Sequence, residues 1–251
     1  MQDKNGAFAK AIAAAQSEGV ALVIVHGGGP QIDAALKAEE ITSEFSGGFR
    51  VTTPEIFEVV ERVLTQEVGP AVARSLQKAG VNAVALSGRT SESLIAEPLR
   101  KLVDGTSADL GLVGVITAVN PQAIRNALKG GQVPVVSPIA TDESFKGGLN
   151  VNADLAAAAI ARALDAQCLI IMTDVAGIYR SWPDISSLIS EISATELGLI
   201  KATFAEGMAP KVQACLDAIK GGASAVRIID GTDPSAFAAA LNNLGGTLVT
   251  K

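Results

Sequence analysis

The chain has 251 residues, of which 48% are hydrophobic but only 4% aromatic, so aliphatic side chains must fill its core. Its formal net charge is −6 and no basic block stands out, which argues against a protein that binds nucleic acid through its electrostatic field. No secretory pattern opens the sequence, and no apolar run reaches the roughly 18 residues that cross a bilayer. We therefore expect a cytoplasmic protein that does not contact membranes.

Expected helices and strands alternate from the first residues onward. Pro54 behind Thr53 marks the start of one long helix and Gly80 its end, because proline suits the first helical position and glycine the position after the last. Hydrophobic periodicity predicts, in chain order, a helix over 6–18, a strand over 21–25, helices over 30–38 and 54–79, a strand over 82–86, β structure over 98–119, a helix over 121–130 and a strand over 133–140.

The second half of the chain continues the same alternation. It predicts a helix over 152–164, a strand over 168–172, an irregular segment over 176–194, helices over 195–202 and 208–220, a strand over 225–230, a helix over 233–243 and a strand over 246–250. Strands that alternate with helices indicate an α/β fold with a mostly parallel, open sheet covered on both faces. A domain boundary is expected near 165–175, where a second group of strand–helix units begins.

Small or polar residues follow several of the expected core strands. In open α/β sheets the ligand binds outside the carboxyl ends of the strands, so residues at these ends are the first candidates for a site. Four strands end in this way, at His26-Gly27-Gly28-Gly29, Ser87-Gly88, Thr173-Asp174 and Asp230-Gly231.

The three consecutive glycines between a strand and a helix are the most informative of these ends. N–H groups at a helix N-terminus carry partial positive charge, and residues without Cβ let a phosphate oxygen approach the backbone. The alternative is a tight turn without a ligand. His26, the only histidine, could act as a general base, but more often such a residue hydrogen-bonds a neighbouring loop and shapes it.

Further motifs accompany the glycine turn in a fixed order. They are HGGGPQI (26–32), FSGGFRVTTPE (45–55), DLGLVG (109–114), NVNADLAAAA (150–159), TDVAGIY (173–179), SLISEIS (187–193), GMAPKVQACLDAIKGG (207–222) and IIDG (228–231). In this order and spacing, they resemble the N-acetylglutamate kinases of the amino acid kinase family. The resemblance covers nearly the whole chain from about residue 6 onward.

The resemblance implies a fold and an activity. The fold would be an open, mainly parallel eight-stranded sheet between helices, with an amino-acid-binding lobe over 1–165 and a nucleotide-binding lobe over 166–251. The activity would be ATP-dependent phosphorylation of the side-chain carboxylate of N-acetyl-L-glutamate, in arginine biosynthesis. Mg²⁺ would arrive with ATP, since the sequence shows no cluster of metal ligands. A homo-oligomer, dimeric or larger, is also implied.

Site residues on the substrate side follow from the same resemblance. The N–H groups of Gly28 and Gly29 would contact the transferring phosphoryl group, while Gly27 lets the turn form and borders the substrate. Arg50 would clamp a substrate carboxylate with its two-pronged guanidinium, and Asn150 would hold the α-carboxylate end through its amide. The alternative for Arg50 is a solvated side chain after a turn.

On the phosphate side, Asp154 would orient catalytic lysines and Lys211 would contact the phosphates of ATP and the transition state. The alternatives are helix capping for Asn152 and Asp154, and a surface lysine at the start of a helix for Lys211. The nucleotide pocket would be lined by Thr173, Asp174, Gly177 and Tyr179, together with Lys211.

One family feature is not found. The family begins with a strand carrying K-[YFL]-G-G, whose lysine contacts the transferring phosphoryl group, and the sequence aligned on HGGGP contains neither the strand nor its lysine. Lys4 and Lys10 do not replace it, because neither follows a strand or precedes a glycine pair. A catalytically impaired protein that binds ligand or regulates is therefore an open alternative. A kinase for an N-blocked aminoadipate is a second one, because one extra methylene changes binding by only about 1–3 kcal/mol.

Overall fold

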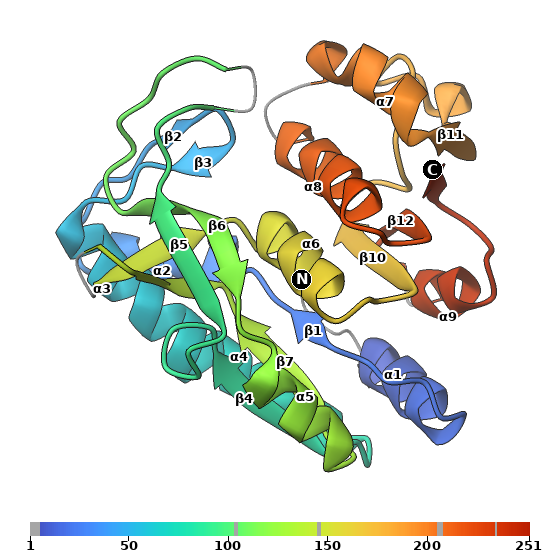
Figure 1. Ribbon diagram of the computed structural model, residues 1–251, viewed down its shortest axis with the longest axis horizontal. Coiled ribbons are helices and arrows are strands. Elements are labelled where there is room, and N and C mark those ends of the chain that lie inside the picture. The colour runs from blue at the N-terminus through green and yellow to red at the C-terminus, as the bar shows by residue number, and fades with distance from the viewer. Residues whose placement is uncertain (1–5, 103–104, 145–146, 205–207, 234) are drawn as a thin grey trace.

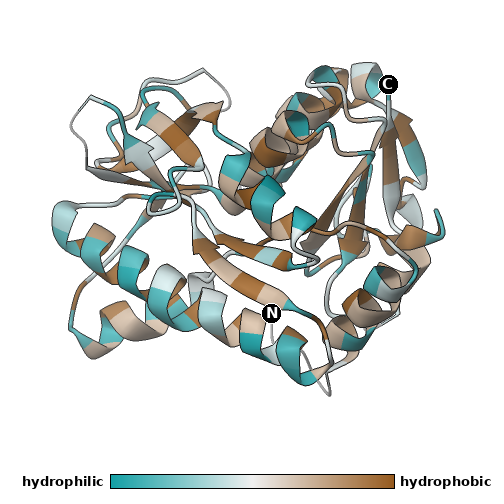
Figure 2. Cartoon of the chain, turned by 60° about the horizontal axis from the view of Figure 1, so that its bottom comes forward, coloured by the Kyte–Doolittle hydropathy of each residue, from teal (hydrophilic) through white to brown (hydrophobic). Residues whose placement is uncertain are grey.

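The computed structural model shows an α/β protein built from two open sheets, a small closed group of strands and a hairpin, with helices around them (Figure 1). It describes residues 6–102, 105–144, 147–204, 208–233 and 235–251. The strands are largely hydrophobic, whereas hydrophilic and hydrophobic residues alternate along the helices (Figure 2). No described helix is both long enough and apolar enough to cross a membrane. The predicted α/β class is confirmed.

The first sheet is parallel throughout and has the order β1-β7-β4. Its strands are β1 (Ile24–Val25), β7 (Val133–Ser137) and β4 (Ala83–Ser87). Val25 pairs with Val136, and Ser87 pairs with Ser137. Because the strands are parallel and in this register, His26, Ser137 and Ser87 lie at the same end of the sheet. The sequence predicts His26 and Ser87 there, but not Ser137.

The second sheet is mixed, with the order β10-β12-β13-β11. Its strands are β10 (Cys168–Thr173), β12 (Ala225–Asp230), β13 (Thr247–Thr250) and β11 (Glu191–Ser193). β10 and β12 are parallel, with Thr173 opposite Asp230, whereas β13 runs antiparallel to β12. The two polar strand ends, Thr173-Asp174 and Asp230-Gly231, therefore lie side by side.

The described strands do not form the single eight-stranded sheet that the resemblance implies. β1 has a ladder partner only in β7, and β10 only in β12, within the part of the chain that the structure describes. Side chains from both strands, Ile24 and Ile170 among them, nevertheless pack on the same hydrophobic cluster. The two sheets thus share a core, although no backbone hydrogen bonds between described residues join their strands.

A third group of strands and a hairpin form the remaining β structure. The group closes in the order β5-β6-β9-β8, and the hairpin pairs β2 with β3. The bounds are β5 (Leu94–Pro98), β6 (Val113–Val119), β8 (Ile139–Asp142), β9 (Gly148–Val151), β2 (Phe45–Ser46) and β3 (Phe49–Arg50). The sequence patterns missed the hairpin and β9, which are short and carry weak alternation, and also β11, which lies in the segment predicted to be irregular. β5 lies almost entirely before the β structure predicted over 98–119. Pro138 divides the run predicted over 133–140 into β7 and β8.

The helices cover the sheets and join them. They are α1 (Ala7–Ser17), α2 (Gly29–Ala38), α3 (Pro54–Arg62), α4 (Gly69–Lys78), α5 (Gln122–Lys129), α6 (Ala153–Ala163), α7 (Ala194–Ile200), α8 (Ala209–Lys220) and α9 (Ala236–Leu241), with short 3₁₀ turns η3 (Ile185–Ser187) and η4 (Lys201–Thr203). α6 packs beside α8 and also contacts β1 and β10 (Figure 1). It is therefore the element that bridges the two sheets.

The helix predicted over 54–79 contains a π-helical segment, η2 (Val63–Val68), between α3 and α4. At its end the N–H of Gly69 donates to the carbonyl of Leu64, five residues earlier. Pro70 follows, and it has no N–H with which to continue the ordinary i→i−4 pattern. A proline inside the predicted helix is thus accommodated by wider turns rather than by a break.

Asn152 positions the N-terminus of α6. Its side-chain Oδ1 accepts hydrogen bonds from the N–H groups of Asp154 and Leu155 at 2.9 and 3.2 Å. We expect Asn152→Ala to lower the free energy of unfolding by about 1 kcal/mol, because these two N–H groups lose their acceptor. Asn152→Ser, which keeps a capping oxygen, should cost much less in the same urea titration. Equal losses in the two variants would contradict the capping role.

Candidate active site

The glycine turn lies between β1 and α2, as the sequence predicted. A Cβ on Gly29 would meet no atom within 4 Å, and one on Gly27 would meet only the Cβ of Ala153, at 3.9 Å. A Cβ on Gly28, by contrast, would lie 2.7 Å from Cδ2 of Leu64. Internal packing therefore explains the glycine at Gly28, while the other two glycines leave open space at the start of a helix.

The first turn of α6 lies between the glycine turn and the first turn of α8. Gly27, immediately before the start of α2, lies against Ala153, the first residue of α6. Lys211, in the first turn of the neighbouring helix α8, donates from Nζ to Oδ2 of Asp154 at 2.9 Å. At the other end, a Cβ on Gly221 would lie 2.7 Å from Cδ of Arg162, so α6 and α8 run side by side in the same direction.

These helix N-termini bring positive potential to the site. Each helix N-terminus carries partial positive charge, although Asn152 already accepts two of the N–H groups of α6. Lys211 adds a full positive charge, and the carboxylate of Asp154 beside it adds a negative one. A lysine in a first helical turn is unfavourable by itself, and the carboxylate of Asp154 offsets that cost. The side chains of Lys211 and Asp154 are 21% and 20% exposed, so the pair is neither a solvated surface contact nor sealed from a ligand. The arrangement suits an anion.

Arg50, at the end of β3, is a buried cation rather than the solvated side chain considered as an alternative. Nη2 donates to Oδ1 of Asp33 at 2.7 Å, and Nη1 donates to Oγ of Ser43. The guanidinium carbon lies 4.5 Å from the ring centroid of Phe45. Only 5% of the side chain of Arg50 is exposed, against 59% for that of Asp33. These two hydrogen bonds use two of the five guanidinium N–H groups, and the other three do not take part in them.

Thr52 links Arg50 to Asn150. Its hydroxyl donates to the carbonyl of Arg50 at 2.8 Å and accepts from Nδ2 of Asn150 at 3.2 Å. Thr52 is fully buried. Sequence reasoning missed this residue, although its position two after Arg50 in an extended segment places both side chains on the same side. The structure thus brings together Arg50 and Asn150, which lie a hundred residues apart.

The four expected nucleotide-pocket residues fall into two places. Thr173 and Asp174 end β10, where the carbonyl of Thr173 accepts from the N–H of Gly231 at 2.8 Å. Gly177 and Tyr179 lie farther along the following segment. A Cβ on Gly177 would lie 2.5 Å from Oγ1 of Thr247, so packing against β13 accounts for that glycine.

The ring of Tyr179 meets the ring of Trp182 edge to face, with centroids 5.2 Å apart. This contact leaves an aromatic pair on the segment between β10 and η3.

His26 turns toward the interior of the first sheet. Its Nδ1 lies 2.9 Å from the carbonyl oxygen of Gly27, and its Nε2 lies 2.9 Å from Oγ of Ser137. Burial lowers the pKa of His26 below its ordinary value, and the hydrogen bond to Gly27 opposes this only in part. These contacts fit a residue that shapes the glycine turn, and both ring nitrogens are already engaged.

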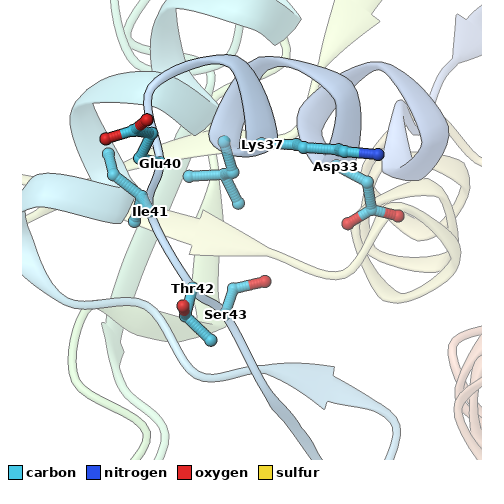
Figure 3. A pocket seen from close by; sticks show the side chains of 7 residues that line it. Asp33, Lys37, Glu40, Ile41, Thr42 and Ser43 are labelled. Atoms are coloured by element: carbon cyan, nitrogen blue, oxygen red, sulfur yellow. The ribbon is translucent and has the colours of Figure 1, made fainter.

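A cavity of about 350 Å³ lies beside α2, away from the glycine turn (Figure 3). It is lined by Asp33, Leu36, Lys37, Glu40, Ile41, Thr42 and Ser43. Asp33 and Ser43 also hold Arg50, but Arg50 itself does not line the cavity. Among the described residues, no group of three or more His, Cys, Asp and Glu side chains could hold a metal ion. Lys10 is exposed on α1, and Lys4 lies outside the described residues.

The fold and the neighbouring helix N-termini define an α/β protein suited to a phosphorylated ligand. The chain belongs to the amino acid kinase family, whose model matches residues 1–230. It is 45% identical over 236 residues to an acetylglutamate kinase from Kineococcus radiotolerans, covering 92% of this chain and 79% of that protein. It is 47% identical to an acetylglutamate kinase from Beutenbergia cavernae, covering 94% and 76%.

A solved structure has the same fold over nearly its whole length. The protein smu.665 from Streptococcus mutans UA159 superposes with a TM-score of 0.81 at 28% identity, covering 96% of this chain and 91% of that one. The resemblance seen in the sequence motifs is thus confirmed at the level of the family, both by sequence and by structure.

Burial of His26 makes stability depend on pH. Since the folded pKa lies below the unfolded value of about 6.5, the unfolded chain binds the proton first as the pH falls. We expect the free energy of unfolding to fall as the pH is lowered through about 6.5, and His26→Asn to lose that component. Urea titrations of both proteins between about pH 8 and 5.5 would test this. Parallel pH profiles would contradict it.

Proposed function

We propose that this chain is an ATP-dependent acetylglutamate kinase of arginine biosynthesis. In that reaction an oxygen of the side-chain carboxylate of N-acetyl-L-glutamate attacks the γ-phosphorus of ATP, the bond to the β,γ-bridging oxygen breaks, and an acyl phosphate and ADP result. The observation that carries the proposal is the first turn of α6, where Ala153 borders the glycine turn and Asp154 holds Lys211 of α8. The names of the relatives supply the substrate.

The phosphoryl group would lie at the glycine turn. Little covalent chemistry is needed from the protein in phosphoryl transfer, so catalysis rests on positioning and charge neutralisation. The N–H groups of Gly28 and Gly29 would donate to equatorial oxygens of the phosphoryl group without reorganisation. Lys211 would neutralise the charge that develops between the β- and γ-phosphates, while Asp154 holds its ammonium group by the 2.9 Å contact.

N-acetyl-L-glutamate would bind on the other side of the turn, between Arg50 and Asn150, with Gly27 at its border. Arg50 would offer the N–H groups that Asp33 and Ser43 do not use, and Asn150 the amide hydrogen not given to Thr52. The hydrogen bonds of Thr52 would fix the backbone carbonyl of Arg50 relative to the amide of Asn150. A relative one methylene longer, an N-blocked aminoadipate, would be rejected by only about 1–3 kcal/mol.

ATP would extend from Lys211 toward the carboxyl ends of β10 and β12. We propose that Thr173, Asp174, Gly177 and Tyr179 border the nucleotide, the last two more distantly than the first two. Mg²⁺ would be held chiefly by the phosphates, where it lowers the charge that the attacking carboxylate meets. In this division of labour, residues 1–165 bind the amino acid and residues 166–251 the nucleotide. A cytoplasmic homo-oligomer completes the proposal.

The proposal is tested by acyl phosphate formation from N-acetyl-L-glutamate and MgATP, trapped as the hydroxamate. We expect product that depends on both substrates, and Lys211→Ala should lower kcat by about 10²–10³-fold, as for the loss of one transition-state donor. Lys220→Ala is the matched control, because Lys220 is exposed at the far end of the same helix. It should leave kcat unchanged.

Binding and turnover are separated by calorimetry on the same preparations. N-acetyl-L-glutamate that binds without forming product would favour the alternative of a ligand-binding or regulatory protein. Faster turnover of N-acetyl-L-aminoadipate would move the assignment to the longer substrate. If a chain shown to be folded neither binds N-acetyl-L-glutamate nor forms product, the kinase proposal is wrong.

The glycine turn offers a comparison that separates folding from catalysis. Gly29→Ala places its methyl group in open space within a helix, so the free energy of unfolding should stay the same or rise by up to about 1 kcal/mol. Its kcat should nevertheless fall, because the methyl group occupies the path of the phosphoryl group. Gly28→Ala should lower stability by about 1–3 kcal/mol through its contact with Leu64. Full activity in Gly29→Ala would exclude a phosphoryl group at this turn.

A further inference from the structure

We propose that His26 is a positioning residue that sets the direction of the Gly28 N–H by holding the carbonyl of Gly27. The orientation of this peptide follows from the contacts of His26 with Gly27 and Ser137. Its consequence for catalysis rests on the proposed function, in which that N–H donates to the transferring phosphoryl group.

The hydrogen positions follow from which atoms can donate. The oxygen of Gly27 only accepts, so Nδ1, 2.9 Å away, must carry a hydrogen. His26 is 8% exposed, and burial favours the neutral ring, which leaves a lone pair on Nε2. The hydroxyl of Ser137 then donates to Nε2 across 2.9 Å. The structure thus assigns the Nδ1–H tautomer to the neutral ring.

The single hydroxyl hydrogen of Ser137 has two acceptors within reach, Nε2 of His26 and the carbonyl of Leu64, and giving it to Nε2 leaves no group without a partner. The Oγ of Ser137 also lies 2.9 Å from the carbonyl oxygen of Leu64, which is an alternative acceptor for the hydroxyl hydrogen. That carbonyl, however, accepts the N–H of Gly69 through the wide turn of η2. All three hydrogen-bonding groups can therefore be satisfied with the histidine neutral.

The surrounding backbone holds this arrangement tightly. A Cβ on Gly69 would lie 3.0 Å from both Nε2 of His26 and Oγ of Ser137. Only a residue without a side chain allows α4 to approach the pair this closely. Ser137 is 2% exposed, so water does not compete for the hydroxyl. The ring of His26 consequently has little freedom to turn away from Gly27.

Peptide geometry transmits the constraint to the site. The C=O of Gly27 and the N–H of Gly28 belong to one planar trans peptide, in which they point in opposite directions. Holding the oxygen toward the buried ring therefore aims the N–H away from it, toward the open side of the turn. Without the histidine, flanking glycines offer little resistance to rotation of this peptide plane. His26 thus supplies the rigidity that three glycines lack.

The first test uses the single histidine of the chain. With ¹⁵N-labelled histidine and no histidine tag, one pair of ring signals is observed and needs no assignment. Near neutral pH we expect a pyrrole-type shift for Nδ1 and a pyridine-type shift for Nε2, with a scalar coupling from Nδ1–H to the carbonyl of Gly27. In Ser137→Ala the tautomers should become mixed. A protonated Nε2 with a bare Nδ1 in the unaltered chain would overturn the proposal, whether or not the chain is a kinase.

The second test compares two replacements of His26. Asn places an N–H donor near the position of Nδ1, whereas Leu has similar bulk and no donor. We expect His26→Leu to lower kcat about 10- to 100-fold, as for a misplaced catalytic group, with the KM for N-acetyl-L-glutamate changed less than about twofold. His26→Asn should recover most of the loss.

Equal activities in these two variants would overturn the catalytic consequence, and so would a change confined to KM. Ser137→Ala keeps the test decisive if His26→Leu fails to fold, since it removes only a hydroxyl and should give an intermediate kcat. If the unaltered chain makes no acyl phosphate, the proposed function fails, while the ring shifts still decide the orientation of the Gly27–Gly28 peptide.

Discussion

The ion pair between Lys211 and Asp154 is the interaction on which the proposed site depends. It joins the first turns of two parallel helices that belong to different halves of the chain, and so brings the end of the first sheet next to the second. Asp154 lies four residues after Asn150, and Ala153 between them contacts the glycine turn. One short segment therefore connects the substrate groups, the turn and the lysine. Because the Lys211–Asp154 ion pair is partly buried, its attraction is stronger than that of a fully exposed pair.

Glycines in this protein are required for two different reasons. Gly28, Gly69 and Gly177 are glycines because neighbouring atoms occupy the space where a Cβ would lie. Gly29 has no such neighbour, and nothing inside the described chain explains the missing side chain. A glycine without an internal reason is a better pointer to a ligand than one in a crowded position. The sequence GGG does not show this difference. In the structure, Gly28 is packed against Leu64, whereas Gly29 faces open space.

Rigidity at the turn comes from residues outside it. Three adjacent glycines would make a flexible loop, and catalysis by backbone N–H groups requires donors that are already aimed. In the proposed arrangement, His26 holds the carbonyl of Gly27, and Ser137 and the π-helical segment before Pro70 hold His26 in place. The same principle applies to Arg50, whose guanidinium is held by Asp33, Ser43 and Phe45 before any substrate arrives.

The sequence by itself determined the α/β class, most helix and strand positions, the strand–turn–helix context of the glycines and the family, because these follow from local periodicity and contiguous motifs. Only the tertiary structure decided which residues meet. The link from Arg50 through Thr52 to Asn150 and the contact of Lys211 with Asp154 join distant segments, and no local pattern encodes them. The separation of β1 and β10 into different sheets was likewise visible only in the tertiary structure, because strand pairing joins segments that are distant in the sequence.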